Sequence, residues 1–397
     1  MTQVSNRIKN LAQSETLAMA QRSRELQVAG LDIINLSIGE PDFNTPDHIK
    51  EAAKLAIDQN YSHYTPVPGF PALRQAIVQK LQRENGLSYD LDQIVVSNGA
   101  KQSISNVLYS ILSPDDEVII PAPFWVSYIE MVKLAEGKCK VISAGVDQDF
   151  KITPAQLEDA ISERTKAFLF SSPSNPTGSI YTKEELAQLA EIFKKYPDII
   201  ILSDEIYEHI IYEGEHNSLA SFSFLKERVV VINGLSKGYA MTGWRVGYIA
   251  APLWIAKACT KLQGQYTSGV CAIAQMAGVA ALNGSIEPTL EMKKVFQRRR
   301  DLVVEIASTI PGIKFNKPTG AFYLFPDVSS YFGKSFNEID VTGSQDLAMF
   351  LLNEGHVATV AGTAFGSPEC IRFSYATSDE KLIEALKRIK LALSKLK

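Results

Sequence analysis

The stretch RVVVINGLSKGYAMTGWRVGY, residues 228–248, decides the fold class. It opens with an apolar, β-branched run that ends at Gly234, which is typical of a short strand buried on both faces. Lys237 follows in a string of small side chains, and Arg245 stands in the next glycine-bounded turn. A lysine so close to the end of a buried strand has no obvious surface to lie on. The stretch therefore indicates a strand end that carries functional cations.

Six further β-rich runs lie between residues 93 and 252, and segments with helical periodicity separate several of them. They are QIVVSNG (93–99), DEVIIPAP (116–123), CKVISA (139–144), KAFLFSS (166–172), DIIILSD (198–204) and VGYIAAP (246–252). One intervening segment, residues 182–196, begins with Thr182 and Glu185 at the spacing of a helix capping box. Alternating strands and helices predict an α/β fold in which helices wrap a mostly parallel sheet of seven strands.

Beyond Gly284 the pattern changes to that of a smaller α+β unit. Residues 292–308 predict a long amphipathic helix, and the C-terminal segment predicts another, capped by Thr377 with Glu380. Three strand-like runs lie between these helices at wider spacing: GAFYLFPDV (320–328), HVATVAG (356–362) and CIRFSYA (370–376).

The segment LSIGEPDFNTP (36–46) is rich in proline and glycine and precedes the first helix of the larger unit. It predicts a crossing between two domains, so the N-terminal helix is expected to pack with the C-terminal unit. We therefore expect a large domain of residues 48–290 and a small domain formed by residues 1–47 and 291–397.

Composition excludes several classes of protein. The chain of 397 residues is 46% hydrophobic and 21% charged, and its net charge of -4 gives no reason to expect nucleic acid or an anionic membrane as partner. The polar N-terminus lacks the apolar core of a signal peptide, and no apolar stretch approaches the roughly 20 residues that span a bilayer. Four scattered cysteines and five histidines show no metal-ligand spacing. We expect reduced, mostly buried thiols, no metal and a cytoplasmic protein.

Polar side chains stand at four of the predicted strand ends. In an open parallel sheet, ligands bind beyond the carboxyl ends of the strands. The run SNGAKQS (97–103) opens a helix with small residues whose N–H groups can cradle a phosphate. Asn175 follows a second strand and Asp204 ends a third, with Tyr207 three residues on, while Lys237 follows a fourth.

This inventory suits one cofactor, pyridoxal phosphate. A lysine amine can bond its aldehyde, and a carboxylate beside the pyridine nitrogen keeps that nitrogen protonated. A phenol and an amide can hydrogen-bond the ring's 3-oxygen, and an arginine can hold the phosphate through two hydrogen bonds. Lys237 is therefore expected to be buried because it anchors the cofactor covalently, with Arg245 at the cofactor's other end.

The motifs SxxNPTG, SDEIYE and SK-x5-GWRxGY, at these mutual distances, are together highly specific. Along nearly its whole length the chain resembles class I, fold type I aminotransferases that depend on pyridoxal phosphate. It is most similar to the bacterial branch of aspartate aminotransferases. The resemblance implies the fold type I architecture of a large cofactor-binding domain and a smaller α+β domain.

The resemblance also implies roles for individual residues. Lys237 bonds the cofactor, Asp204 pairs with the pyridine nitrogen, and Tyr207 and Asn175 bind the 3-oxygen. The phosphate site matches Arg245, Ser236 and the backbone of Gly99, Ala100 and Lys101. Trp125, in APFWVSY, matches the aromatic residue that stacks on the ring. Arg372 matches the arginine that binds the substrate α-carboxylate, and Gly39 matches the backbone that closes over substrate. Tyr64 matches a tyrosine that reaches the phosphate of the neighbouring subunit, which implies a homodimer.

The expected reaction is transamination between L-aspartate and 2-oxoglutarate, giving oxaloacetate and L-glutamate. Aspartate needs a second cation for its distal carboxylate, and residues 261–275 contain no arginine to supply it. Lys101 is the candidate, because it starts the helix at the phosphate site; the alternative is that Lys101 only neutralises phosphate. An aromatic or broad-specificity aminotransferase and a β-eliminating lyase share the cofactor residues and stay open.

Two departures from the family pattern bear on these expectations. Gly234 stands where some relatives have a hydroxyl, which leaves the phosphate one donor fewer. Relatives that accept prephenate carry a lysine near the N-terminus, where this chain reads LAQSET (11–16), so prephenate is not expected as a substrate. A nicotinamide-dependent reductase would need GxGxxG after a strand, and no predicted strand is followed by it. A regulator would need an appended DNA-binding module, for which the chain has no room.

Overall fold

The computed structural model describes residues 4–397, and its largest sheet has seven strands in the order β2-β8-β7-β6-β5-β3-β4. These are β2 (Ile94–Asn98), β3 (Glu117–Ala122), β4 (Lys138–Ser143), β5 (Thr165–Ser171), β6 (Ile200–Asp204), β7 (Val229–Gly234) and β8 (Val246–Ala250). All neighbouring pairs are parallel except those of β8, which runs antiparallel to β2 and β7. The predicted seven-stranded, mostly parallel sheet is confirmed, and each predicted run is one of its strands.

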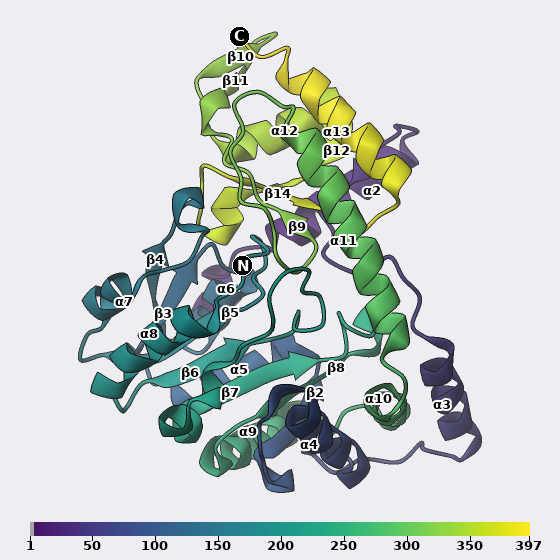
Figure 1. Cartoon of the computed structure of the whole chain (residues 1–397), viewed down its shortest axis with the longest axis vertical. Helices are drawn as coiled ribbons and strands as arrows, with labels where there is room; N and C mark the ends of the chain where they lie inside the picture. Colours follow the sequence, from purple (N-terminus) through teal and green to yellow (C-terminus); the bar gives the residue numbers. More distant parts are fainter. Residues whose placement is uncertain (1–3) are drawn as a thin grey trace.

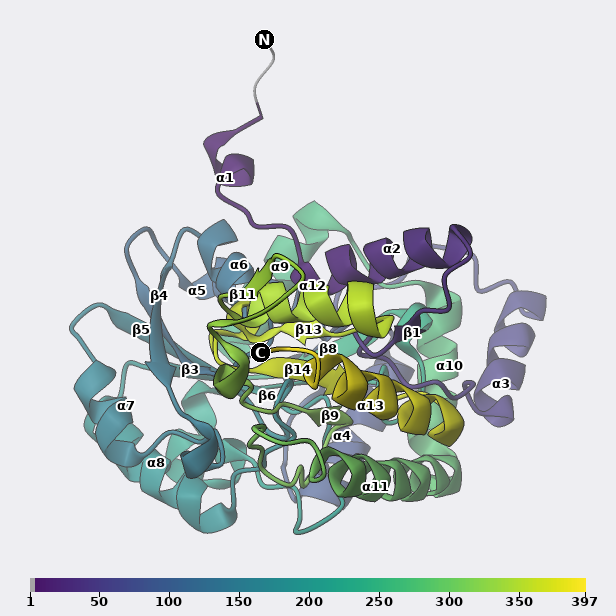
Figure 2. The ribbon, with the colours of Figure 1, turned by 90° about the horizontal axis from the view of Figure 1, so that it is seen from above.

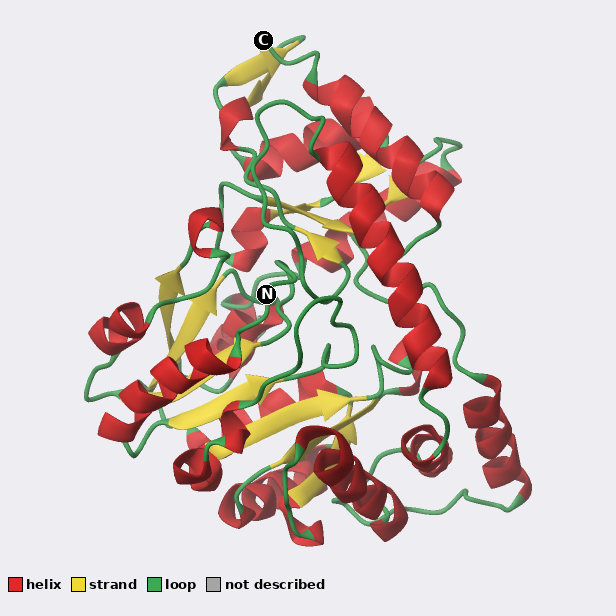
Figure 3. Cartoon of the chain, in the orientation of Figure 1, coloured by secondary structure: helices red, strands yellow, loops and turns green. Residues whose placement is uncertain are grey.

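Successive residues of the buried strands belong to two different hydrophobic cores. In β7, Val229 and Val231 pack in one core, while Val230 and Ile232 pack in the other. Because successive side chains of a strand point to opposite faces, a continuous apolar run requires cover on both faces. Figure 3 shows helices on either side of the strands.

The helices divide between these two cores. One core contains α3 (Asp47–Asp58), α4 (Pro71–Asn85), α7 (Pro154–Ala160), α8 (Lys183–Lys195) and α10 (Ala272–Asn283). The other contains α5 (Ala100–Ile111), α6 (Ser127–Leu134) and α9 (Leu253–Tyr266). The capping box predicted for α8 is confirmed, since the Thr182 hydroxyl accepts the Glu185 N–H and the Glu185 carboxylate accepts the Thr182 N–H.

A second unit lies above the large sheet in Figure 1. Its strands form a sheet of order β13-β14-β9, a parallel pair β1-β12 and a hairpin β10-β11. The strands are β1 (Ile34–Asn35), β9 (Tyr323–Leu324), β10 (Lys334–Phe336), β11 (Ile339–Val341), β12 (Val357–Ala358), β13 (Val360–Ala361) and β14 (Ile371–Ser374). Its helices are α2 (Glu15–Val28), α11 (Glu287–Ala307), α12 (Ser344–Gly355) and α13 (Asp379–Leu393), and a short helix, α1 (Asn6–Lys9), precedes them.

The N-terminal helix packs with this second unit, as the crossing segment predicted. Met19 of α2 shares a hydrophobic cluster with Ala348, Leu352 and Ala358. Figure 2 shows α2 beside α12, with α1 projecting away from the body. The limits of the two expected domains stay a prediction, and the predicted division after residue 290 falls inside α11.

Three details of the C-terminal unit differ from the sequence-based expectations. The N-cap of α13 is Ser378, whose hydroxyl accepts the Lys381 N–H, so the predicted cap at Thr377 was wrong by one residue. Both residues are hydroxyl-bearing, and only the backbone decides which of them ends the extended segment. The run 356–362 divides into two short strands that belong to different sheets, and the hairpin β10-β11 was not predicted.

The four cysteines are free, with Cys259 and Cys370 buried, Cys139 partly buried and Cys271 exposed. None of the helices within residues 4–397 has both the length and the apolar character needed to cross a bilayer.

Candidate active site

A cavity of about 370 Å³ lies at the carboxyl ends of β5, β6 and β7. Eleven of the thirteen predicted site residues line it: Gly39, Ala100, Lys101, Trp125, Asn175, Asp204, Tyr207, Ser236, Lys237, Arg245 and Arg372. Gly99 is not part of the lining but caps the helix that begins at Ala100. Tyr64 is 99% exposed and lies outside the cavity of its own chain. The chain's own folding therefore gathers every predicted site residue except Tyr64.

Lys237 stands three residues beyond β7, with its side chain partly buried in the cavity wall. Its ammonium donates to the Gly39 carbonyl across 2.6 Å and lies 5.7 Å from the centre of the Tyr207 ring. Burial lowers the pKa of Lys237 to about 8. At physiological pH a larger fraction of Lys237 is therefore the neutral amine than in an exposed lysine. A nucleophile or a proton acceptor must be in this neutral form.

Asp204 is the last residue of β6 and is buried. Its Oδ2 accepts the Tyr128 hydroxyl at 2.6 Å, and its Oδ1 accepts the Ile206 N–H at 3.3 Å. Burial raises the pKa of Asp204 to about 6, although both hydrogen bonds act in the opposite direction. Asp204 forms no ion pair with a cation of residues 4–397, and a buried carboxylate of this kind is suited to pair with a cationic ligand, such as a protonated pyridine.

The hydroxyls of Tyr207 and Tyr323 form a hydrogen bond of 2.7 Å, and both side chains line the cavity. Burial, together with the neighbouring Tyr323, raises the pKa of Tyr207 well above its ordinary value. The phenol therefore stays protonated and available as a hydrogen-bond donor at neutral pH.

Arg372 lies in β14, is only 2% exposed, and forms no ion pair with a carboxylate of residues 4–397. Its guanidinium donates to Asn175 Oδ1 at 2.9 Å and to the Ser37 carbonyl at 2.6 Å, while its Nε is buried without a partner. The guanidinium also lies 4.6 Å from the centre of the Tyr323 ring. A buried cation with a spare donor calls for an anionic ligand, and a planar carboxylate matches its geometry.

An anion cradle forms the floor beside Lys237. Gly99 has a φ of +81° and is the N-cap of α5, whose first N–H groups have no partner within the helix. A Cβ at Gly99 would lie 2.2 Å from a guanidinium nitrogen of Arg245. Arg245 itself donates to the carbonyls of Thr242 and Asn98, at 2.9 and 3.3 Å. Helix N–H groups, a guanidinium and the Ser236 hydroxyl together suit a phosphate.

Lys101 is the second residue of α5, beside this cradle, and its ammonium lies 4.8 Å from the centre of the Trp125 ring. Burial and the charge of Arg245 lower the pKa of Lys101. Part of the Lys101 side chain is nevertheless exposed to solvent, so it can move within the mouth of the cavity.

Ten lining residues were not predicted from the sequence, and four of them bear on the site's chemistry: Tyr128, Tyr323, Ser14 and Thr16. Tyr128 stands three residues after Trp125, and the two rings meet edge to face at 5.6 Å, so helical spacing offered a weak signal for it. The N-terminal arm, residues 14–17, carries no sequence signal of a site, because only tertiary packing brings these residues over the cavity. Thr16 is notable because its hydroxyl is buried there without a partner.

The chemical groups that line the cavity fit pyridoxal phosphate. The cavity presents an amine of lowered pKa, a buried carboxylate without a cationic contact, a protonated phenol and an anion cradle. The opposite wall adds a buried guanidinium with an unused donor. Each of these groups has a chemical counterpart in the cofactor or in a carboxylate substrate.

Comparison with known proteins agrees with this geometry. The family model "Aminotransferase class I and II" matches residues 31–389. An aspartate/prephenate aminotransferase of Cereibacter sphaeroides is 47% identical over 98% of each chain. The aspartate aminotransferase of Rhizobium meliloti superposes with a TM-score of 0.96 at 42% identity over 100% of both chains. The structure of the Thermus thermophilus aspartate aminotransferase with maleate superposes with a TM-score of 0.93 at 39% identity, and the match covers 99% of this chain and 100% of that chain.

The chain therefore belongs to the class I and II aminotransferase family. It is an enzyme that depends on pyridoxal phosphate, with the fold type I architecture.

Proposed function

We propose that the protein transfers the amino group of L-aspartate to 2-oxoglutarate, giving oxaloacetate and L-glutamate. One observation carries this proposal: the buried Arg372, without a carboxylate partner in residues 4–397, lines the same cavity as a second cation, Lys101. Two cations suit a substrate with two carboxylates. The likeness to a Thermus thermophilus aspartate aminotransferase with maleate, a dicarboxylate, supports the same substrate class.

The cofactor would lie with its phosphate in the cradle of Gly99, Ala100, Ser236 and Arg245. Asp204 would face the ring nitrogen, while Tyr207 and Asn175 would face the 3-oxygen and Trp125 the ring. Pyridoxal phosphate, when bound, supplies an aldehyde that bonds an amine and a cationic ring that accepts the electron pair released at the substrate Cα.

Lys237 has two tasks in this proposal. At rest its amine would hold the cofactor. During turnover the freed amine would take the proton from the substrate Cα and deliver it to the cofactor carbon that carried the aldehyde. The lowered pKa of Lys237, about 8, suits a base that must be neutral and then protonated within one cycle. Its hydrogen bond to the Gly39 carbonyl aims the nitrogen into the cavity.

Residues of the cavity wall would orient the substrate. Arg372 would bind the α-carboxylate, with Asn175 and Tyr323 fixing the plane of its guanidinium. Lys101 would attract the distal carboxylate, and Thr16, whose buried hydroxyl has no partner in residues 4–397, lines the same cavity. Gly39 closes the wall with its backbone, where a side chain would collide with the Tyr323 hydroxyl at 2.4 Å.

Aromatic donors are the second candidate, because Lys101 is an exposed, flexible side chain that can move away from an apolar substrate. Prephenate is a third, on account of the name of the Cereibacter sphaeroides relative. The arm over the cavity contributes Ser14, Thr16 and Leu17 and no cation, so we expect prephenate to be a poor acceptor.

The proposal includes a homodimer in the cytoplasm, with Tyr64 reaching the phosphate of the partner's site. The full exposure of the Tyr64 side chain in a single chain supports this arrangement, because an aromatic ring of that size is seldom left wholly in water. We also propose that residues 48–290 form the cofactor-binding domain, with residues 1–47 and 291–397 as the small domain.

A donor screen with 2-oxoglutarate tests the function. The purified protein, loaded with pyridoxal phosphate, is given each of the common L-amino acids, and the glutamate formed is measured. We expect aspartate to give the highest kcat/KM, and Lys237→Ala to give no turnover. Higher values for phenylalanine or tyrosine would replace aspartate by an aromatic donor. Release of ammonia and pyruvate-type products without glutamate would show a lyase.

A further inference from the structure

The residues that follow β6 form a single turn with two functional faces. The Glu208 N–H donates to the Glu205 carbonyl at 3.0 Å, which closes a tight turn over residues 205–208 directly after Asp204. Asp204 and Tyr207, three residues apart, line the cavity. Glu205 and Glu208 have the same spacing and do not line it; both carboxylates are buried behind the turn instead.

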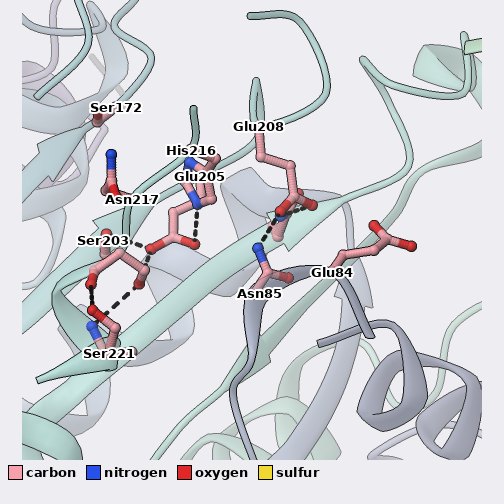
Figure 4. Close-up of polar contacts among 12 residues, drawn as sticks. Glu84, Asn85, Ser172, Ser203, Glu205, Glu208, His216, Asn217 and Ser221 are labelled. Atoms are coloured by element: carbon pink, nitrogen blue, oxygen red, sulfur yellow. Dashed lines mark hydrogen bonds and ion pairs between the residues drawn. The ribbon is translucent and has the colours of Figure 1, made fainter. Parts of the chain in front are cut away.

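Glu205 is held by three donors. Its Oε1 accepts the hydroxyls of Ser203 at 2.8 Å and Ser218 at 2.5 Å, and its Oε2 contacts His216 Nε2 at 2.9 Å. Burial lowers the pKa of His216, but the Glu205 carboxylate outweighs it and raises that pKa overall. Figure 4 shows Glu205 with Ser203 and His216 around it. These contacts tie the start of the turn to β6 and to the loop at residues 216–218.

Glu208 is held by a separate set of donors. It pairs with the ammonium of Lys80 in α4, which is only 1% exposed, and its Oε2 accepts the Asn85 amide at 2.9 Å. Its Oε1 accepts the side-chain amide of Asn233 at 2.7 Å. Glu84 and His209 lie close by, and Figure 4 shows Glu84 and Asn85 beside Glu208. The ligand atoms of Glu84, Glu208 and His209 could hold a metal ion, but the Lys80 ammonium already pairs with both carboxylates of this cluster.

Asn233 connects this cluster to the second half of the site. It lies in β7, and its Oδ1 accepts the N–H of Gly234, the last residue of that strand. The chain reaches Lys237 three residues later. Glu208 therefore fixes the turn that presents Tyr207 and also the strand end that leads to Lys237.

We propose that Glu205 and Glu208 are positioning residues that hold Asp204, Tyr207 and the Lys237 strand end at the spacing the cofactor requires. Neither carboxylate touches the cavity, and each acts through the backbone of the turn. The inference rests on the proposed function only in taking the cavity as the cofactor site. Two buried charges cost desolvation, and apolar side chains of the same size would pack at no such cost, so stability alone is a weak reason for them.

The experiment compares cofactor binding and fold in three single variants. Glu208→Gln and Glu205→Gln remove one charge each with little change in shape. Glu117→Gln is the matched control, because Glu117 is also a buried carboxylate, bonded to Ser162 and Arg164, but lies at the opposite, amino end of β3. For each protein we would measure the cofactor dissociation constant, the pH midpoint of the bound cofactor's absorbance change, and Tm.

We expect all three variants to lower Tm, since each disturbs a buried charge. Glu205→Gln and Glu208→Gln should also raise the cofactor dissociation constant by about tenfold, the scale on which groups that orient ligands act. They should move the absorbance midpoint by more than about half a pH unit, because Asp204 and Tyr207 then meet the ring differently. Glu117→Gln should change neither quantity.

A second variant covers the case in which Glu208→Gln does not fold. The double change Lys80→Met with Glu208→Met removes both charges and keeps the volume, so the fold should survive. It still lacks the bonds to Asn85 and Asn233, and we expect the same shifts in dissociation constant and midpoint. Folded variants that retain the parent's values for both quantities would overturn the proposal. A parent protein that binds no pyridoxal phosphate would instead overturn the proposed function.

Discussion

The Tyr128 hydroxyl lies 2.6 Å from Oδ2 of Asp204, and both side chains are buried. The phenol donates, because its own pKa is raised far above neutrality by burial and by the carboxylate beside it. A hydrogen bond to the ionised form of a carboxyl group favours that form. Tyr128 thus opposes the burial that raises the pKa of Asp204 to about 6, and it keeps Asp204 able to carry charge at neutral pH.

Tyr128→Phe should raise the pKa of Asp204 further, because the group loses a donor and keeps its burial. Cofactor affinity measured from pH 5 to pH 9 should then reach its upper plateau about one unit higher in pH than in the parent. Tyr331→Phe is the control, since it removes a hydroxyl that is bonded only to the Pro311 carbonyl, remote from the site. An unchanged pH profile in Tyr128→Phe would mean that Asp204 relies on other groups.

Lys237 provides a test that needs no cofactor. Its pKa is about 8 in the folded protein, against 10.5 for the unfolded side chain. Between these values the unfolded chain binds more protons, so the stability of the folded state rises with pH across this window. Below pH 8 the folded protein must bury an ammonium, and that cost disappears above pH 10.5.

Cofactor-free Lys237→Met should therefore gain stability over the parent at pH 7. The difference in free energy of unfolding should shrink by on the order of 2–3 kcal/mol between pH 7 and pH 10.5. Urea unfolding at several pH values measures it, with the exposed Lys54→Met as control. A difference that stays constant with pH would place the Lys237 pKa near its ordinary value.

Arg372→Lys should impair every amino donor alike. The guanidinium matches a carboxylate with two parallel donors, and a lysine offers only a point charge. We expect kcat/KM to fall about 100-fold for aspartate and for phenylalanine, since both carry the α-carboxylate. Arg298→Lys, at an exposed ion pair with Asp379, should leave both unchanged. A loss confined to aspartate would assign Arg372 to the distal carboxylate.

The large sheet was predictable because all of its strands except the edge strand β4 are apolar on both faces, a pattern that few other structures produce. The positions of the site residues followed from the sheet, since Asp204 ends its strand and Asn175 and Lys237 follow theirs, at strand ends that share one edge. The shorter strands of the C-terminal unit were less predictable. A run such as 356–362 has the same composition whether it forms one strand or two, and only its neighbours decide.

The remaining site residues depend on packing between segments far apart in sequence. Thr16 reaches the cavity because α2 packs on the C-terminal unit, and no local pattern encodes that contact. Glu205 and Glu208 stood within a recognised motif, but only the turn geometry shows that they face away from the cavity. Family resemblance supplied Tyr64, for which the isolated chain offers no partner within its own cavity.

Tyr64 allows a test of the dimer. If each site borrows Tyr64 from the partner, a heterodimer of Tyr64→Phe and Lys237→Ala subunits has one site with both lesions and one with neither. Random mixing of equal amounts should place about a quarter of all sites in the intact class. The mixture should therefore regain activity above the mean of the two separate variants, measured after unfolding and refolding the subunits together. A mixture with no gain would show that Tyr64 acts within its own chain.

We propose that Lys101 selects the substrate, and its two alternative roles predict different losses of activity. Its ammonium lies over the Trp125 ring at 4.8 Å, burial and the charge of Arg245 lower its pKa, and Lys101 and Arg245 both line the cavity. If it binds the distal carboxylate, Lys101→Ser should reduce kcat/KM for aspartate and glutamate by about one to two orders of magnitude, the worth of one charge-assisted hydrogen bond. The kcat/KM for phenylalanine and tyrosine should change far less, and the cofactor dissociation constant should stay close to the parent's.

Lys138→Ser, at an exposed ion pair with Asp115, serves as the control for loss of a surface charge. Equal losses for acidic and aromatic donors, together with weaker cofactor binding, would show that Lys101 serves only the phosphate, and the aspartate assignment would then rest on likeness to relatives alone.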